Sequence, residues 1–228
     1  MKVGVISDVH ANLPALEAVL ADMPRVDDVV CAGDVIGYNP WPAACLARVR
    51  EVASITVRGN HDATVETPER YRANRMAQAG LEHAKAELTE TEVGWLRDRP
   101  RTATIGESSD PFLLVHSHPS SDREGAYVYP EEFQTLARFV DADDYAGIVL
   151  GHTHVQAAER VGDGLLVVNP GSVGQPRDAD PDAAYAVLDT ARREVDLRRV
   201  DYDRERVRSA VESAGLPSRT AERLFDGR

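Results

Sequence analysis

Short apolar runs alternate with stretches of helical spacing at the start of this chain, and no other feature of the sequence limits the fold as strongly. Residues 3–6, 29–32 and 54–57 have the length and composition of buried strands. Residues 13–23 and 42–52 lie between them and place apolar side chains at helical spacing. Strand–helix–strand units of this length build a mainly parallel sheet, so the pattern predicts an α/β fold.

The chain then becomes helical before it returns to strands. Residues 69–99 carry helical patterns, and a second helix is expected to begin at Thr89, where Glu92 completes a capping box. Residues 112–115 and 148–150 are short apolar runs that are typical of buried strands.

Turn residues predict two hairpins in the second half of the chain. Asp163-Gly164 separates two strand-like runs, and Thr190-Ala191 separates another pair. Residues 203–228 have the pattern of two short helices. Because the sequence contains no repeat or linker, we expect a single domain over residues 1–228 that has two sheets and carries the 203–228 tail packed on it.

Polar residues follow five of the predicted strands at their carboxyl ends, which is where ligands bind in open α/β sheets. Six of the seven histidines of the chain lie in these five stretches, and His83 is the exception. The stretches are Asp8-Val9-His10, Gly33-Asp34, Gly59-Asn60-His61-Asp62, His116-Ser117-His118 and Gly151-His152-Thr153-His154.

Each of these motifs alone has an ordinary explanation, since a Gly-Asp pair often forms a turn and an Asn-His-Asp sequence often caps a loop. Together they would bring two carboxylates and several imidazoles to one place without a compensating charge, which is costly. A pair of divalent cations removes that cost. Carboxylate, amide and imidazole donors without a thiolate suit Mn, Fe, Co, Ni, Zn or Mg rather than a cysteine-bound structural zinc.

The charge of the chain limits its partners. A net charge of −12 argues against stable nucleic-acid binding and against a membrane-binding face. Two metal ions would nevertheless keep the pocket positive, so we expect a small phosphorylated or nucleotide-like substrate. The chain starts directly with a strand-like run and has no membrane-length apolar segment, which predicts a cytoplasmic protein. The sequence leaves the oligomeric state open, with a homo-oligomer among the allowed states.

Taken in order, the five stretches resemble the motifs of the calcineurin-like metallophosphoesterase superfamily. The wider sequence is similar to a small bacterial and archaeal phosphodiesterase-type subgroup. The similar segments are Gly33-Asp34-Val35-Ile36-Gly37-Tyr38, Asn169-Pro170-Gly171-Ser172-Val173-Gly174-Gln175-Pro176-Arg177 and Gly215-Leu216-Pro217. The resemblance implies an α/β fold with a four-layer α-β-β-α sandwich, in which two mixed sheets are flanked by helices.

The resemblance also implies a dinuclear centre in which one carboxylate is shared by both ions, with Mn as the favoured metal. Seven side chains would hold the ions: Asp8, His10 and His154 the first, Asn60, His116 and His152 the second, and Asp34 both.

The reaction implied by the resemblance is phosphodiester hydrolysis by in-line attack of a metal-bridging hydroxide. His61 would act as the acid for the leaving oxygen, and Asp62 would orient His61. A dinucleoside polyphosphate hydrolase and a phosphomonoesterase are alternatives. A protein phosphatase is disfavoured, because Gly37 and Tyr38 stand where that branch usually has an arginine. A non-catalytic scaffold of the same fold is disfavoured by the presence of His61.

Three further residues are candidates for substrate binding, each with a structural alternative. Arg58 either contacts the phosphate or packs. Tyr38, together with Trp41, either stacks on a nucleobase or packs on the sheet. His118 departs from the Gly-Ser-Pro sequence usual in the subgroup at this place, and it is either an extra substrate or metal contact or a solvent-facing loop residue.

Overall fold

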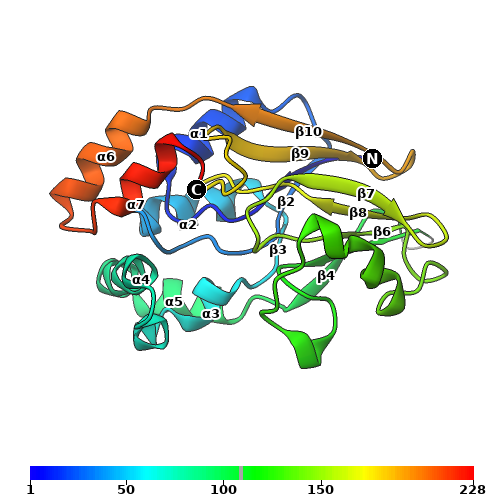
Figure 1. Ribbon diagram of the computed structural model, residues 1–228, viewed down its shortest axis with the longest axis horizontal. Helices are drawn as coiled ribbons and strands as arrows, with labels where there is room; N and C mark the ends of the chain where they lie inside the picture. Colours follow the sequence, from blue (N-terminus) through cyan, green and yellow to red (C-terminus); the bar gives the residue numbers. More distant parts are fainter. Residues whose placement is uncertain (108–109) are drawn as a thin grey trace.

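Two five-stranded sheets form the centre of the computed structural model, which describes residues 1–107 and 110–228 (Figure 1). In spatial order, the first sheet contains β10 (Glu194–Val200), β9 (Ala183–Asp189), β1 (Lys2–Ile6), β2 (Asp28–Cys31) and β3 (Ile55–Thr56). The second sheet contains β4 (Thr102–Ile105), β5 (Phe112–Val115), β6 (Gly147–Val149), β8 (Leu165–Asn169) and β7 (Ala157–Val161). Helices flank the sheets, so the predicted α-β-β-α architecture is confirmed.

Both sheets are mixed. In the first, β1, β2 and β3 are parallel, and the β9–β10 hairpin is added antiparallel to β1. In the second, β5, β6 and β8 are parallel, while β4 and β7 pair antiparallel at the two edges. The parallel strands of each sheet therefore end at a common edge, where polar residues can converge.

The alternation of side chains along β1 fills two cores. Val3 and Val5 are buried in a cluster with Phe112 and Val149 from the second sheet. Ile6 points to the opposite face and joins the cluster beneath the helices. Because both faces of β1 are covered, its sequence is apolar from Val3 to Ile6, after the exposed Lys2.

Helices that follow the strands cover the outer face of the first sheet (Figure 1). The Asn12 side chain caps the first of them by accepting a hydrogen bond from the Ala15 peptide N–H at 3.3 Å. The helices are α1 (Leu13–Asp22), α2 (Pro42–Val52), α3 (Asn60–Thr64), α4 (Arg75–Glu87), α5 (Glu90–Arg97), α6 (Arg204–Ser213) and α7 (Arg219–Glu222). The 3₁₀ helices are η1 (Pro68–Tyr71), η2 (Ser121–Arg123), η3 (Pro130–Arg138) and η4 (Arg223–Phe225).

The predicted helical stretch at residues 69–99 is present but interrupted. It divides into η1, α4 and α5, and the expected capping box at the start of α5 is confirmed, because Thr89 and Glu92 exchange hydrogen bonds. The sequence did not predict β4, α3 or η3. β4 is a half-exposed edge strand and α3 is only five residues long. η3 is a 3₁₀ helix, although Phe133, Leu136 and Ala137 have helical spacing.

The tail at residues 203–228 forms α6, α7 and η4, with a break at Gly215, whose φ is +68°. Val207 and Leu224 are fully buried in the cluster beneath the helices, so hydrophobic contacts attach the tail to the first sheet. No helix within residues 1–107 and 110–228 is long and apolar enough to span a membrane.

Candidate metal centre

The carboxyl ends of strands from both sheets bring the predicted ligands into one cluster. Asp8 and His10 follow β1, and Asp34 follows β2. His116 follows β5, and His152 and His154 follow β6 in the second sheet. Potential ligand atoms lie within 4.8 Å of one another in three groups: Asp8 with His10 and His154, His10 with Asp34 and His61, and Asp34 with His116 and His152. Asn60, at the start of α3, joins them with its Oδ1 3.0 Å from His116 Nε2.

The backbone is unusual at these positions. Non-glycine residues rarely adopt a left-handed conformation, which costs about 1–2 kcal/mol per residue. Five of the candidate ligands nevertheless have a φ between +46° and +70°: Asp8, His10, Asp34, His152 and His154. Strained conformations of this kind accumulate where the surrounding structure fixes a functional side chain.

Backbone carbonyls fix the orientation of four imidazoles. A carbonyl oxygen can only accept, so the ring nitrogen that faces it must carry a proton and the other ring nitrogen is left with a lone pair. These contacts are His10 Nδ1 to Ile36 O at 3.1 Å, His116 Nδ1 to Ala32 O at 2.8 Å, His154 Nδ1 to Gln175 O at 2.6 Å and His152 Nε2 to Gly125 O at 3.0 Å.

The remaining nitrogens face other electron-rich atoms. His10 Nε2 lies 3.1 Å from His154 Nε2, and the latter lies 3.2 Å from Asp8 Oδ1. Asp8 Oδ1 is buried and has no hydrogen-bond partner among the described residues. Such a convergence of acceptors without donors is unfavourable unless cations lie between them. The residues present therefore fit divalent metal ions.

The electrostatics of Asp34 and His116 agree with this conclusion. Their Oδ2 and Nε2 atoms are 3.3 Å apart and both side chains are buried. Burial by itself would lower the pKa of His116, but the charge of Asp34 and the hydrogen bond to it raise that pKa to about 10. Asp34 therefore favours a positive charge at this position, which either a protonated His116 or a bound cation can supply.

The environment of His61 is different. Its peptide N–H donates to Asp34 Oδ1 at 2.8 Å, and its ring lies against the rings of His10, Tyr38 and Tyr71 at centroid distances of 4.8 to 4.9 Å. The Nδ1 atom is buried and has no hydrogen-bond partner among the described residues. Burial lowers the pKa of His61 to about 4, so the ring is neutral in this environment.

Asp62 contacts the backbone rather than the ring of His61. Its two carboxylate oxygens accept four peptide N–H groups: those of Asp34 at 2.9 Å, Val35 at 3.0 Å, Ile36 at 3.3 Å and Gly59 at 3.1 Å. Within the described part of the chain, no hydrogen bond joins Asp62 to the His61 ring. The contacts thus differ from the expectation that Asp62 orients His61, because backbone donors use both oxygens and hold the loop that carries Asp34.

The three candidate substrate residues lie in different places. Tyr38 lines a cavity of about 170 Å³ together with Asp34 and His61. Arg58 lies outside that cavity and donates to the Arg97 carbonyl at 2.8 Å. His118 also lies outside it: its ring packs on Phe139 at 4.6 Å, and its Nδ1 accepts from the Ser120 peptide N–H at 3.1 Å. For His118 the packing alternative agrees with these contacts. Arg58 also lines a second cavity, of about 190 Å³, together with the candidate ligands Asn60 and His116, so both of its alternatives stay predictions.

Five cavity-lining residues were not singled out from the sequence as substrate contacts. Arg177 is the last residue of the 169–177 motif, and the others lie in loops and helix ends that carry no recognisable sequence motif. The residues are Tyr71, Asn74, Tyr127, Arg177 and Arg223. Tyr127 stacks on His152 with a centroid distance of 4.2 Å, so it covers one of the candidate ligands.

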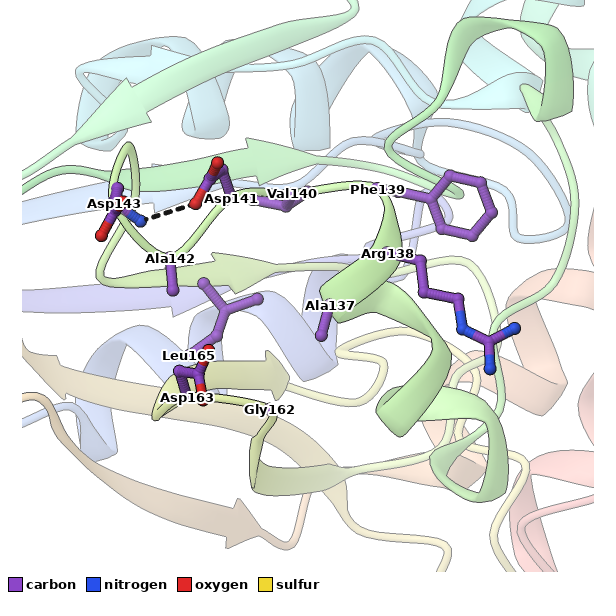
Figure 2. Close-up of a pocket in the computed structure, with 10 residues that line it drawn as sticks. All are labelled: Ala137, Arg138, Phe139, Val140, Asp141, Ala142, Asp143, Gly162, Asp163 and Leu165. Carbon is purple, nitrogen blue, oxygen red and sulfur yellow. Dashed lines mark hydrogen bonds between the residues drawn. The ribbon is translucent and has the colours of Figure 1, made fainter.

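A larger cavity, of about 510 Å³, lies elsewhere. Figure 2 shows it between the end of η3, the loop that follows and the turn of the β7–β8 hairpin. Its polar side chains are Arg138, Asp141, Asp143 and Asp163, and it contains none of the candidate ligands. The candidate ligands therefore line the smaller cavities, of about 170 and 190 Å³, rather than this larger one.

Comparison with known proteins agrees with the fold. Residues 1–193 match the model of the calcineurin-like phosphoesterase superfamily domain. The crystal structure of a metallophosphoesterase from Sphaerobacter thermophilus is 33% identical, with a TM-score of 0.81 and coverage of 100% of both chains. The uncharacterized protein MJ0912 of Methanocaldococcus jannaschii is 28% identical over 99% of this chain and 98% of its own length. Phosphodiesterase YfcE of Escherichia coli K12 is 30% identical over 83% of this chain and 88% of its own.

The match covers most of the chain and includes every residue of the ligand cluster, and the buried acceptors of that cluster require cations. The chain therefore belongs to the calcineurin-like phosphoesterase superfamily and is a metal-dependent phosphoesterase.

Proposed function

We propose that this protein hydrolyses phosphodiester bonds with two divalent metal ions held in the ligand cluster. The observation that carries the proposal is the position of Asp34, whose carboxylate belongs both to the group around His10 and to the group around His116. One side chain can therefore serve two neighbouring cations. The 30% identity with a phosphodiesterase supports diesters as the substrate class.

The ions would be divided between the two sides of the cluster. Asp8, His10 and His154 would hold the first, Asn60, His116 and His152 the second, and Asp34 both. Imidazole, amide and carboxylate donors suit Mn, Fe, Co, Ni, Zn or Mg, and among these the family resemblance favours Mn. When bound, such a pair acidifies water and neutralises the charge of the phosphoryl oxygens.

Hydrogen bonds within the protein hold the proposed ligands in place before metal or substrate binds. Carbonyl oxygens hold the imidazoles in one tautomer, and Asp62 anchors the loop that carries Asp34 through backbone hydrogen bonds. Partners of this kind orient ligands before substrate binds, and their loss commonly weakens metal affinity about 10–100-fold.

His61 is the candidate for proton delivery to the leaving oxygen. Its ring lies within reach of Asp34 and His10 but is not one of the seven proposed ligands. A neutral imidazole has one N–H that can hydrogen-bond the departing alkoxide, and transfer of a proton to it would use the imidazolium form of the ring. His61 would therefore act on the leaving group while the ligand set remains complete.

The test compares substrate classes on metal-exchanged protein. The chelated protein is reconstituted with Mn, Mg, Co, Ni, Zn or Fe(II) and assayed with bis(p-nitrophenyl) phosphate, p-nitrophenyl phosphate, cyclic nucleotides and dinucleoside polyphosphates. We expect the diester to be hydrolysed with a higher kcat/KM than the monoester, and two ions per chain in metal analysis. Faster hydrolysis of the monoester with every metal, or a protein that binds no ions, would contradict the proposal. His83→Ala is the matched control, because His83 lies outside the cluster and contacts the Pro40 carbonyl.

A further inference from the structure

Two arginines line the cavity beside the ligand cluster. Arg177 and Arg223 share this cavity with Tyr38, His61 and His154. They come from positions far apart in the sequence, and both are partly buried. Neither was expected from the sequence to contact a ligand.

Arg177 is held beside His154. Its peptide N–H donates to the His154 carbonyl at 3.1 Å. Its guanidinium donates to Gln175 Oε1, the shorter distance being 2.7 Å, and to the Tyr38 hydroxyl at 3.2 Å. These partners are neutral, so they position the charge of Arg177 without compensating it.

Arg223 comes from the tail, beyond residue 193, where the match to the family model ends. The next residue, Leu224, is fully buried, and the Gly227 carbonyl accepts from the Ala179 peptide N–H at 2.9 Å. These contacts attach the tail to the loop that follows Arg177. The Arg223 side chain donates to the carbonyl of Arg228.

Neither arginine is paired with an Asp or Glu side chain in the described residues, although Arg223 donates to the main-chain oxygen of Arg228, the last residue of the sequence. Within residues 1–107 and 110–228, no Asp or Glu oxygen lies within 4.0 Å of the guanidinium of Arg177 or Arg223, whereas the nearby Arg199 and Arg204 each pair with aspartates. Burial and the neighbouring charge of Arg177 lower the pKa of Arg223 to about 10. Two adjacent cations at the wall of a cavity, neither of which faces an Asp or Glu carboxylate of the described residues, are stabilised by an anion.

The arginines stand beside the ligand cluster rather than within it. Asp8 and Asp34 have imidazoles at ion-pair distance, and neither guanidinium reaches these carboxylates. Asp8 and Asp34 therefore do not supply the anion for Arg177 and Arg223, and it would have to come from a ligand in the cavity.

We propose that Arg177 and Arg223 bind a second phosphate group of the substrate, one that is not hydrolysed. The substrate class is then a phosphodiester or phosphoanhydride that carries a further phosphate, such as a nucleotide with a terminal phosphate. This inference rests on the proposed function, since it assigns the substrate of the same site.

The experiment compares two substrates that share a leaving group. Thymidine 5′-(p-nitrophenyl phosphate) has one phosphate, and its 3′-phosphorylated counterpart has two. Arg223→Gln and Arg177→Gln are assayed beside Arg192→Gln, which removes an equal charge from the exposed turn of the β9–β10 hairpin. Loss of a charge-assisted hydrogen bond should weaken binding about 10–100-fold. We expect kcat/KM to fall at least about tenfold more for the bisphosphate than for the monophosphate, mainly through KM.

Equal losses on both substrates would mean that the arginines act on the hydrolysed phosphate, and no loss on either would mean that they only pack; both results overturn the inference. Thermal denaturation checks that each variant folds. Equilibrium binding separates this inference from the proposed function. If the wild-type protein hydrolyses neither ester, it should still bind thymidine 3′,5′-bisphosphate more tightly than thymidine 5′-monophosphate, and Arg223→Gln should remove that preference. The absence of any preference in the wild-type protein overturns the inference.

Discussion

The Nε2 atoms of His10 and His154 lie 3.1 Å apart at the centre of the ligand cluster, and each ring has its other nitrogen against a backbone carbonyl. A neutral imidazole has a single N–H, so two lone pairs face each other across this gap. The arrangement is unfavourable in an empty cavity and favourable around a cation. It explains why the chain holds five of its ligand residues in left-handed backbone conformations.

Metal removal should destabilise the protein measurably. A ligand present at 100 times its Kd stabilises the folded state by about 2.7 kcal/mol, and each kcal/mol shifts Tm by about 2–4 °C in a protein of this size. We expect Mn²⁺ at that excess to raise the Tm of the chelated protein by about 5–10 °C in differential scanning fluorimetry. His83→Ala should respond as the wild type does, whereas His154→Ala should lose most of the shift. An unchanged Tm in the wild type would argue against a cation between His10 and His154.

His61→Ala should keep both ions and lose turnover. Removal of a positioned acid costs about 10²–10⁴-fold in rate, and the cost is larger for a poor leaving group. We expect kcat to fall more for an alkyl diester than for a p-nitrophenyl diester, with two ions per chain retained in elemental analysis. Wild-type rates on both diesters would remove His61 from the mechanism, and loss of an ion would make it a ligand instead.

Asp62→Asn should act through the loop of Asp34. The asparagine amide has one acceptor oxygen, so some of the four peptide N–H groups that Asp62 satisfies would face an NH₂ group. Each unsatisfied buried donor costs about 1–3 kcal/mol, which urea denaturation can measure. Metal affinity should fall as well, because the loop would no longer hold Asp34. Asp163→Asn, on an exposed turn, is the control; an Asp62→Asn variant of wild-type stability would show that the contacts of Asp62 are dispensable.

Replacing each of two helical glycines by alanine should change the stability of the protein in opposite directions. A Cβ at Gly80 in α4 would lie 2.1 Å from the Tyr38 nitrogen, whereas a Cβ at Gly94 in α5 would meet only Arg97 Nη2, at 3.7 Å. Gly80→Ala must therefore move α4 or the Tyr38 loop, at a cost of about 1–3 kcal/mol. Gly94→Ala should stabilise the helix by about 0.5–1 kcal/mol, because alanine loses less backbone entropy. Urea denaturation of the pair measures the difference, and equal effects would contradict the close packing of α4 on the Tyr38 loop.

The sequence was sufficient to predict where the candidate ligands gather. Asp8, Asp34 and His116 each follow a short apolar run closely, so the sequence shows both the strand and the polar residue at its carboxyl end. The carboxyl ends of parallel strands lie at the same edge of a sheet, which brings these residues together. The two-sheet fold could be predicted for the same reason, since each strand carries its own apolar pattern.

Other features depend on tertiary contacts and leave no local pattern. The position of Asp62 is decided by backbone donors from a loop about 28 residues away, which no motif spacing reveals. Arg223 reaches the cavity because the tail folds back against the loop at Ala179. The edge strand β4 alternates polar and apolar residues, but over only four positions, which is the lower limit for recognising a strand.

The ligand cluster spans the seam between the sheets: Asp8 and Asp34 extend from the first sheet, and His116 and His152 from the second. Neither sheet alone can complete a coordination shell. During synthesis, the last ligand emerges only with His154, and the sheets must dock before all donors meet. Metal binding at this cluster is therefore expected only after the two sheets have docked, and bound ions would then stabilise the contact between the sheets.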